Sequence, residues 1–169
     1  DPNVLDGQSA LAETEKFIAL GPRISGTDGA EKAAAYLYQR LRALEIDAEL
    51  DVFSDPAPGG PTTFRNVLGR IPGAGSNWVV IASHYDTKSG VSHDFAGAND
   101  SGSSTGLLLE LGRQLRLERQ LPTYPDLPAS VLLAFLDGEE CRERYGPHDG
   151  LHGSRRLAAR LIHGRRTAA

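Results

Sequence analysis

The sequence predicts an α/β fold, a three-layer αβα sandwich around a mixed, mostly parallel central sheet. Two continuous apolar runs, 78–82 and 131–136, have the length and composition of strands buried on both faces. A helical pattern with leucines on one face lies between them, which gives the order strand, helix, strand of a right-handed βαβ unit. The chain has 169 residues, enough to bury a core, so one domain is expected.

The first half supplies two helices and two strands. Good helix formers predict a helix from about 8 to 20, and apolar residues spaced by three and four predict another over 29–45 with Asp28 as its N-cap. Alternation of apolar and acidic residues over 46–52 indicates a half-exposed strand, and 63–71 is a second strand candidate. Both strands are expected toward one edge of the sheet.

The second half alternates buried strands with helices. The run 78–82 is followed by a polar loop, 83–99, and by a helix from about 101 to 117. The run 131–136 is followed by an acidic loop and by a helix from about 151 to 162. Ligands bind such sheets beyond the carboxyl ends of the strands, so a functional site is expected in the two loops that follow the apolar runs.

Composition narrows the class of function. The formal net charge of -4 argues against a basic nucleic-acid-binding face, and the absence of a long apolar run argues against a membrane-spanning helix. Cys141 is the only cysteine, which excludes an internal disulfide and a C-x-x-C metal site. The chain contains no methionine, even at position 1, so a removed export signal or a trimmed N-terminus is expected, with a slight preference for an extracytoplasmic or secreted protein.

Metal-ligand side chains gather in the two loops after the apolar runs. The first loop begins with His84 and Asp86 and ends at Asp100, and the second contains Glu139 and Glu140. Imidazole and carboxylate ligands suit Zn²⁺ where thiolates are lacking. Of two adjacent glutamates, one can bind a metal while its neighbour moves a proton. The sequence therefore predicts one cleft in which His84, Asp100 and the glutamate pair hold a divalent cation.

Each of these residues also has an ordinary structural interpretation. Asp100 before a helix is a common N-cap, His84 can hydrogen-bond a carbonyl, and an acidic pair after a turn is usually solvated. Other catalytic patterns are weaker. The serines near the expected helix start lack G-x-S-x-G, the segment 97–102 lacks G-K-[ST], and no base can be named for Cys141. The joint placement of the acidic residues and His84 favours the metal site.

At these motifs the sequence resembles the zinc-dependent M28 peptidase superfamily, which includes the glutaminyl-peptide cyclotransferases. The resemblance rests on an N-terminal segment, an H-x-D motif, an aspartate segment and a tandem-glutamate motif, which stand here as Gly21–Thr27, His84-Tyr85-Asp86, Gly97-Ala98-Asn99-Asp100 and Asp137-Gly138-Glu139-Glu140. The four motifs occur in the family's order and cover nearly the whole chain. The resemblance implies a single catalytic domain of this family over 1–169.

The resemblance also implies a role for each residue. Asp100 and Glu140 would be zinc ligands, and Glu139 the general base and acid. His84 would bind metal in the two-zinc aminopeptidases but would lie beside the single zinc of the animal-type cyclases, and Asp86 would orient it. The implied cofactor is Zn²⁺, one ion if the chain is cyclase-like and two if it is aminopeptidase-like. The implied substrate is a peptide or protein N-terminus, and the oligomeric state stays open.

Three local features favour the cyclase branch. The tandem glutamates follow Asp-Gly directly, Lys88 follows the H-x-D motif, and the stretch 141–151 is longer than in the two-zinc aminopeptidases. Tyr145 in that stretch would match an aromatic residue of the cyclase substrate pocket. The favoured function is thus glutaminyl-peptide cyclotransferase, which converts an N-terminal glutamine to pyroglutamate with loss of ammonia. The alternatives are an M28 zinc aminopeptidase and a non-catalytic peptide-binding module.

Two further metal ligands of the family, an aspartate and a histidine from downstream segments, have no counterpart here. The remaining histidines that do not fall in matching motifs are His93, His148, His152 and His163. Asp100 and Glu140 alone would leave zinc under-coordinated, because a zinc site normally has about three or four protein ligands. We therefore expect a domain truncated at its C-terminus that binds zinc weakly and turns over little.

Overall fold

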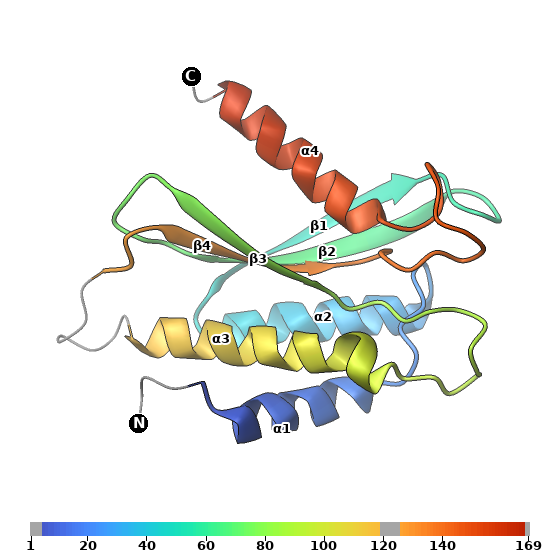
Figure 1. Cartoon of the computed structure of the whole chain (residues 1–169), viewed down its shortest axis with the longest axis horizontal. Coiled ribbons are helices and arrows are strands. Elements are labelled where there is room, and N and C mark those ends of the chain that lie inside the picture. Colours follow the sequence, from blue (N-terminus) through green and yellow to red (C-terminus); the bar gives the residue numbers. More distant parts are fainter. Residues whose placement is uncertain (1–4, 119–125, 168–169) are drawn as a thin grey trace.

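The computed structural model describes residues 5–118 and 126–167 and shows a four-stranded sheet with helices on both faces (Figure 1). In the order β1-β2-β4-β3, the strands are β1 (Asp47–Asp55), β2 (Thr62–Ile71), β4 (Ser130–Leu136) and β3 (Trp78–His84). The helical segments are α1 (Gly7–Ile18), α2 (Asp28–Ala43), the π-helical η1 (Ala98–Ser103), α3 (Ser104–Glu118) and α4 (His152–Thr167). Within these described ranges, no helix combines the length and apolar character needed to cross a bilayer.

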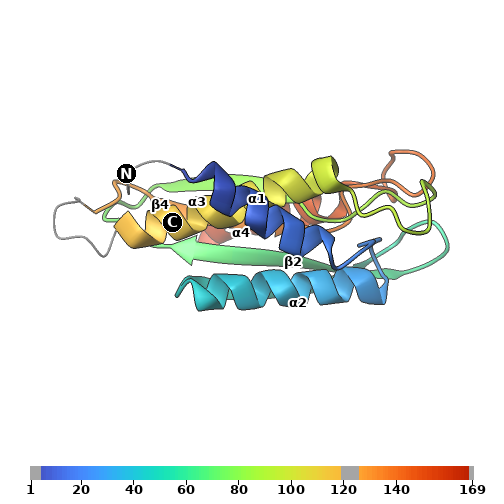
Figure 2. The same ribbon diagram turned by 90° about the horizontal axis from the view of Figure 1, so that it is seen from below.

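The predicted α/β class with helices on both sides of a mixed sheet is confirmed. Figure 1 shows α1, α2 and α3 on one side of the sheet and α4 on the other. Figure 2 shows α1 along α3, and α2 beside β2, in agreement with their contacts. The expectation of a mostly parallel sheet is wrong: among the strands of the described residues, only β3 and β4 pair in parallel, whereas β1–β2 and β2–β4 are antiparallel. β2 folds back on β1 as a hairpin and presents its other edge to β4 in the antiparallel sense.

The N-terminal helices form close to their expected positions, with one difference at a cap. The Asp6 side chain accepts a hydrogen bond from the backbone N–H of Gln8 at 2.9 Å and so caps α1. The N-cap of α2 is Thr27, not Asp28. Asp28 lies instead in the first helical turn, where a negative charge interacts favourably with the helix dipole.

The two apolar runs differ in burial, although both form strands as predicted. Every residue of β4 is buried, which confirms the expectation for 131–136. The prediction is wrong for 78–82, because Trp78 is 50% exposed and Val79 48%. β3 lies at the edge of the described sheet with β4 as its one strand neighbour. An apolar strand at an edge therefore exposes side chains that a second neighbour would cover.

The helix expected over 101–117 is divided in two. It begins as the irregular η1, with Gly97 as N-cap at φ +51°, and only α3 continues as a regular helix. Leu108 is 4% exposed and packs in the core, but Leu107 is 49% exposed, so the expectation that the leucines of this helix share one face is wrong for Leu107.

The core and the strand register together define the functional edge of the sheet. The larger core cluster lies on the side of α2 and α3, and a smaller one, which includes Leu157 of α4, lies on the opposite face. In the parallel pair, His84 at the end of β3 is the register partner of Leu136 at the end of β4. The two loops that follow these strands therefore start side by side, as the sequence predicts.

Candidate metal centre

Three side chains from different elements meet beyond the carboxyl ends of β3 and β4. His84 ends β3, Asp100 lies in η1, and Glu140 follows β4. Each offers one ligand atom, and these atoms lie within 4.8 Å of one another. The three residues line an open pocket of about 510 Å³ together with Glu139 and Tyr145. The prediction that His84, Asp100 and the glutamate pair share one cleft is therefore confirmed.

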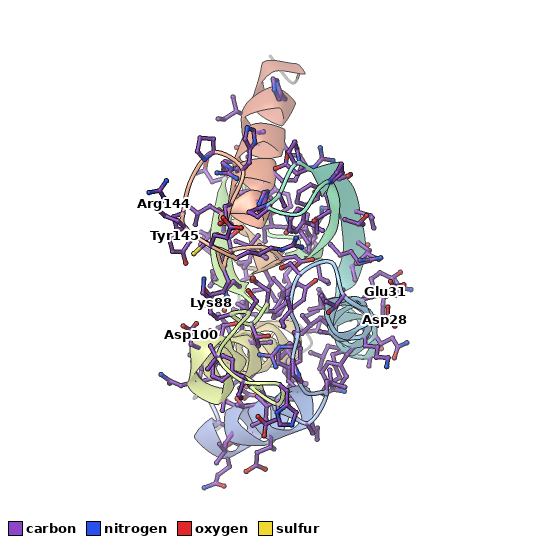
Figure 3. All side chains as sticks on the ribbon, turned by 90° about the vertical axis from the view of Figure 1, so that its right-hand side faces the viewer. Asp28, Glu31, Lys88, Asp100, Arg144 and Tyr145 are labelled. Atoms are coloured by element: carbon purple, nitrogen blue, oxygen red, sulfur yellow. The ribbon has the colours of Figure 1, made fainter. Side chains whose placement is uncertain are left out.

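The donor set of this cluster fits zinc. One imidazole nitrogen and two carboxylate oxygens are ligand types that Zn²⁺ takes up, and none of them requires a thiolate. Among the described residues, no second group of three His, Cys, Asp or Glu side chains is arranged to hold a metal ion. Figure 3 views the molecule from the end where these loops lie, with Asp100, Lys88 and Tyr145 along one side.

The imidazole of His84 lies between two carboxylates. Its Nε2 is 2.9 Å from Oδ1 of Asp100, and its Nδ1 is 3.3 Å from Oδ1 of Asp86. Burial alone would lower the pKa of His84, but the hydrogen bonds and charges of Asp86 and Asp100 outweigh it and raise that pKa to about 9. The Asp100 side chain therefore contacts His84, while the helical N-cap position belongs to Gly97.

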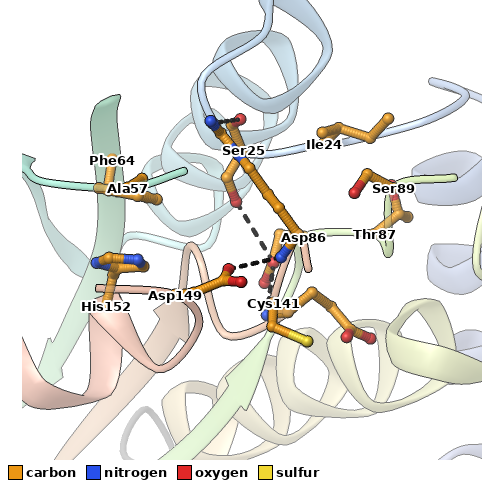
Figure 4. Close-up of a pocket in the computed structure, with 12 residues that line it drawn as sticks. Ile24, Ser25, Ala57, Phe64, Asp86, Thr87, Ser89, Cys141, Asp149 and His152 are labelled. Atoms are coloured by element: carbon orange, nitrogen blue, oxygen red, sulfur yellow. Dashed lines mark hydrogen bonds between the residues drawn. The ribbon is translucent and has the colours of Figure 1, made fainter. Parts of the chain in front are cut away.

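The buried side chain of Asp86 is hydrogen-bonded to several of the site residues. It is 1% exposed, and besides its contact with His84 it accepts the backbone N–H groups of Glu139 at 3.2 Å and Glu140 at 3.0 Å. The Ser25 hydroxyl lies 3.4 Å from Asp86 and donates to Asp137 at 2.7 Å. Figure 4 shows Ser25 and Asp86 beside a small cavity of about 10 Å³. Asp86 thus fixes the backbone of the glutamate pair as well as the ring of His84.

Glu139 is held apart from the three ligand atoms. Its Oε1 accepts the backbone N–H of Ser154, at the start of α4, at 2.7 Å. Burial raises the pKa of Glu139; the Ser154 hydrogen bonds oppose the rise and the nearby Asp86 charge adds to it. A carboxyl group whose pKa is raised is a stronger base in its ionised form, which suits it to accept and return a proton. Glu139 thus lines the same pocket as the ligand cluster, and the general-base role that the resemblance implies for it stays a prediction.

Tyr145 and Lys88 occupy different positions relative to the pocket. Tyr145 is 57% exposed, lines the pocket and places its hydroxyl 3.4 Å from Oε2 of Glu140. Lys88 does not line it: its ammonium group donates to the carbonyl oxygen of Cys141 and lies 3.0 Å from the Cys141 sulfur. Lys88 therefore ties the loop after β3 to the loop after β4.

Sequence reasoning missed the residues that support the site from outside. Asp149 is 7% exposed and accepts the backbone N–H groups of Arg142, Glu143 and Arg144 at 2.6–2.9 Å. These bonds shape the loop that presents Tyr145. An aspartate in a polar loop carries no sequence signal for such a role, because its partners are backbone groups.

Comparison with known proteins places these features in a family. The profile of peptidase family M28 matches residues 66–169. The glutaminyl-peptide cyclotransferase of Drosophila melanogaster is 35% identical over 143 residues, which cover 84% of this chain and 40% of that protein. The glutaminyl-peptide cyclotransferase-like protein of Bos taurus is 37% identical over 140 residues, which cover 80% of this chain and 37% of that protein.

A solved structure agrees with the sequence relatives. The glutaminyl cyclase of an Acidobacteriales bacterium matches with a TM-score of 0.85 and 35% identity, over 97% of this chain and 55% of that chain. The chain thus spans about 40% of the length of the curated relatives. The profile match includes the H-x-D motif, the aspartate segment and the tandem glutamates, and it extends over more than half of the chain. The chain therefore belongs to peptidase family M28.

Proposed function

We propose that this chain carries the metal site and the proton-transfer group of a glutaminyl-peptide cyclotransferase. The observation that carries the proposal is the shared pocket, in which the ligand atoms of His84, Asp100 and Glu140 lie within 4.8 Å and Glu139 stands apart from them. Similarity to proteins named glutaminyl-peptide cyclotransferase and glutaminyl cyclase supports this chemistry. The proposed substrate is a peptide or protein with an N-terminal glutamine.

Asp100 and Glu140 would hold a Zn²⁺ ion, with the imidazole of His84 beside it. Because His84 is protonated at neutral pH in the free site, metal binding at that position would release a proton. A bound zinc ion would polarise the γ-amide carbonyl of the substrate glutamine. Asp100 and Glu140 are fewer than the three or four protein ligands of a usual zinc site, so we expect weak binding, and the metal is supplied in excess in the experiments below.

Glu139 would move the proton that cyclisation requires. Its carboxylate takes a proton from the substrate α-amine, whose nitrogen forms a bond to the γ-amide carbon. The bond from that carbon to the amide nitrogen then breaks, and Glu139 returns the proton so that the nitrogen leaves as ammonia. The Ser154 N–H fixes the carboxylate, and burial, which raises the pKa of Glu139, makes this carboxylate a stronger proton acceptor than an exposed one.

The walls of the pocket would position the N-terminal residue. Tyr145, Leu136 and Leu151 line it together with the polar groups. An apolar wall displaces water from the substrate side chain and leaves the amide facing the ligand cluster. The open mouth of the pocket allows the rest of the peptide to remain outside.

One observation favours a second candidate function, that of an M28 aminopeptidase. His84 lies within ligand distance of the cluster, as a residue that binds metal must. In that reading Glu139 would activate a water molecule that attacks the first peptide bond. The two reactions release different products, so one assay separates them.

The test offers the zinc-supplied protein a Gln-peptide and a Leu-peptide and measures ammonia and free amino acid. We expect zinc-dependent ammonia release from the Gln-peptide and no cleavage of the Leu-peptide. Glu139→Gln should reduce ammonia release by at least about a hundredfold, in the range of general acid–base contributions. Glu143→Gln is the matched control, because Glu143 is an exposed glutamate of the neighbouring loop and does not line the pocket.

Three outcomes would contradict the proposal. Unchanged ammonia release in Glu139→Gln would remove this residue from the mechanism. Release of free leucine without ammonia would select the aminopeptidase. Zinc near zero after dialysis, together with neither product, would select the peptide-binding module.

A further inference from the structure

Arg23 is a fully buried cation whose hydrogen bonds go to backbone carbonyl groups. It is 0% exposed, and its Nε donates to the carbonyl of Tyr85 at 2.7 Å. Nη1 donates to the carbonyls of Ala96 at 2.7 Å and Gly21 at 3.1 Å, and Nη2 lies 3.5 Å from that of Gly97. Burying a charge in this way is costly unless each donor is used, so the arrangement specifies one geometry.

The carbonyl groups that Arg23 binds belong to both ends of one loop. Tyr85 directly follows His84 at the end of β3, whereas Ala96 and Gly97 directly precede η1, which carries Asp100. One planar guanidinium therefore joins the two chain segments that deliver these site residues. In Figure 1 the loop extends from the end of β3 to the start of η1 next to α3, and its tip, 90–94, is exposed.

Further contacts hold Arg23 itself in place. Its backbone N–H donates to the Thr87 hydroxyl at 2.8 Å, and its carbonyl accepts the Thr87 N–H at 3.2 Å. The guanidinium lies 4.5 Å from the centre of the Phe17 ring. Burial lowers the pKa of Arg23 to about 10, and the Asp86 charge opposes that shift, so the side chain stays charged at neutral pH.

We infer that Arg23 is a positioning residue for the metal centre, which closes the loop between β3 and η1 and so sets the approach of His84 to Asp100. This inference rests on the proposed metal site but not on which reaction the site performs. A lysine at position 23 would keep the charge but lose the planar fork, so it could satisfy only part of this set of carbonyls.

The first test compares the zinc affinity of Arg23→Lys with that of the unaltered chain, by competition with a chromogenic chelator. We expect zinc binding at least about tenfold weaker, the usual effect of removing a group that orients metal ligands. Arg40→Lys is the matched control: Arg40 pairs with Glu13 between α1 and α2, away from the site. It should change zinc affinity less than about twofold, since it touches none of the loops at the site.

The second test needs no metal. Hydrogen exchange in the zinc-free chain should be at least about tenfold faster over 85–102 in Arg23→Lys, with β4 and α2 as protected as before. If Arg23→Lys does not fold, Thr87→Val takes its place. This nearly isosteric change removes only the hydroxyl that holds the Arg23 backbone, and it should act in the same direction with a smaller effect of about threefold.

The outcomes separate this inference from the proposed function. A folded Arg23→Lys that binds zinc as tightly as the unaltered chain, or exchanges no faster over 85–102, overturns the inference alone. Weakened zinc binding without cyclase activity in the unaltered chain overturns only the proposed reaction. If the unaltered chain binds no zinc, the proposed function fails, and the exchange measurement decides whether Arg23 closes the loop.

Discussion

Burial divides the carboxylates of the site into two kinds. The Asp100 side chain is 65% exposed and lines the pocket, where a ligand can reach its carboxylate. Asp86 and Asp137 are at most 1% exposed, and both accept backbone N–H groups. These buried carboxylates hold the backbone around the site through their hydrogen bonds. Replacing one of them by a neutral side chain should therefore alter protein stability and the loop conformation more directly than the chemical step.

Asp137 gives the zinc-free protein a pH-dependent stability. Burial, followed by the Asp86 charge, raises the pKa of Asp137 from an ordinary 3.8 to about 7. Between these pH values the folded protein holds a proton that the unfolded chain has lost. The contribution of Asp137 to stability is therefore greatest below about pH 4, falls as the pH rises toward 7, and stays constant above that. Urea unfolding of the zinc-free chain between pH 5 and 8 measures this slope.

Asp137→Asn should make the slope less steep, because an amide does not titrate, whereas the contribution of His84, whose pKa is raised to about 9, remains. The variant also loses one acceptor for Ser25 or Arg65, so its stability at a single pH is not the readout. Asp28→Asn, at an exposed position in α2, serves as the control and should keep the slope of the unaltered chain. An unchanged slope in Asp137→Asn would show that this carboxyl is ionised throughout the range.

At the scale of elements, local sequence patterns predicted where helices and strands form, but predicted less well how each element is buried and paired. The runs that form β3 and β4 are equally apolar in sequence, yet β4 is buried and β3 exposes Trp78 and Val80, because burial depends on neighbouring strands. The antiparallel pairing of β2 with β4 is equally non-local.

The same distinction applies to the site. The H-x-D motif, Asp100 and the tandem glutamates could be found because strand ends and ligand-type side chains are visible in sequence. The support by Arg23 and Asp149 could not be found, because these side chains bind backbone groups of segments that come together only in the folded chain. Backbone partners leave no trace in side-chain patterns.

The loop that carries Tyr145 depends on Asp149. The two carboxylate oxygens accept three backbone N–H groups, and an asparagine offers only one oxygen acceptor. Asp149→Asn should therefore loosen this loop and speed tryptic cleavage after Arg144 severalfold. It should raise KM for a Gln-peptide more than it lowers kcat, because Glu139 and Glu140 are held by other contacts.

His148→Asn is the control for this loop, since His148 is an exposed residue beside Asp149. It should leave both cleavage and KM close to those of the unaltered chain. A loss of kcat in Asp149→Asn with unchanged KM and unchanged cleavage would contradict the assigned role of the loop.

On the scale of the whole molecule, the two faces of the sheet are unequally covered. In the described parts of the chain, α2 and α3 pack on one face, with α1 behind them, whereas α4 is the one helix on the other (Figure 1). Val80 pairs in register with Leu132, which faces the smaller cluster, so Val80 and Trp78 lie on the face of α4. On α4 itself, Leu161 is 40% exposed and Ile162 60%. The apolar edge strand β3 therefore borders the face of the sheet on which α4 packs, and apolar side chains are exposed on both elements.

This edge should make the chain self-associate as its concentration rises. Val80 is 40% exposed on β3, at the sheet edge, where unpaired backbone groups and apolar side chains favour pairing with another chain. Val80→Lys should shift sedimentation velocity profiles toward the monomer, because a charge on an edge strand opposes strand pairing. Val91→Lys adds the same charge at an exposed position on the loop after β3 and should leave the profile unchanged. Equal effects of the two substitutions would attribute the change to net charge and not to the β3 edge.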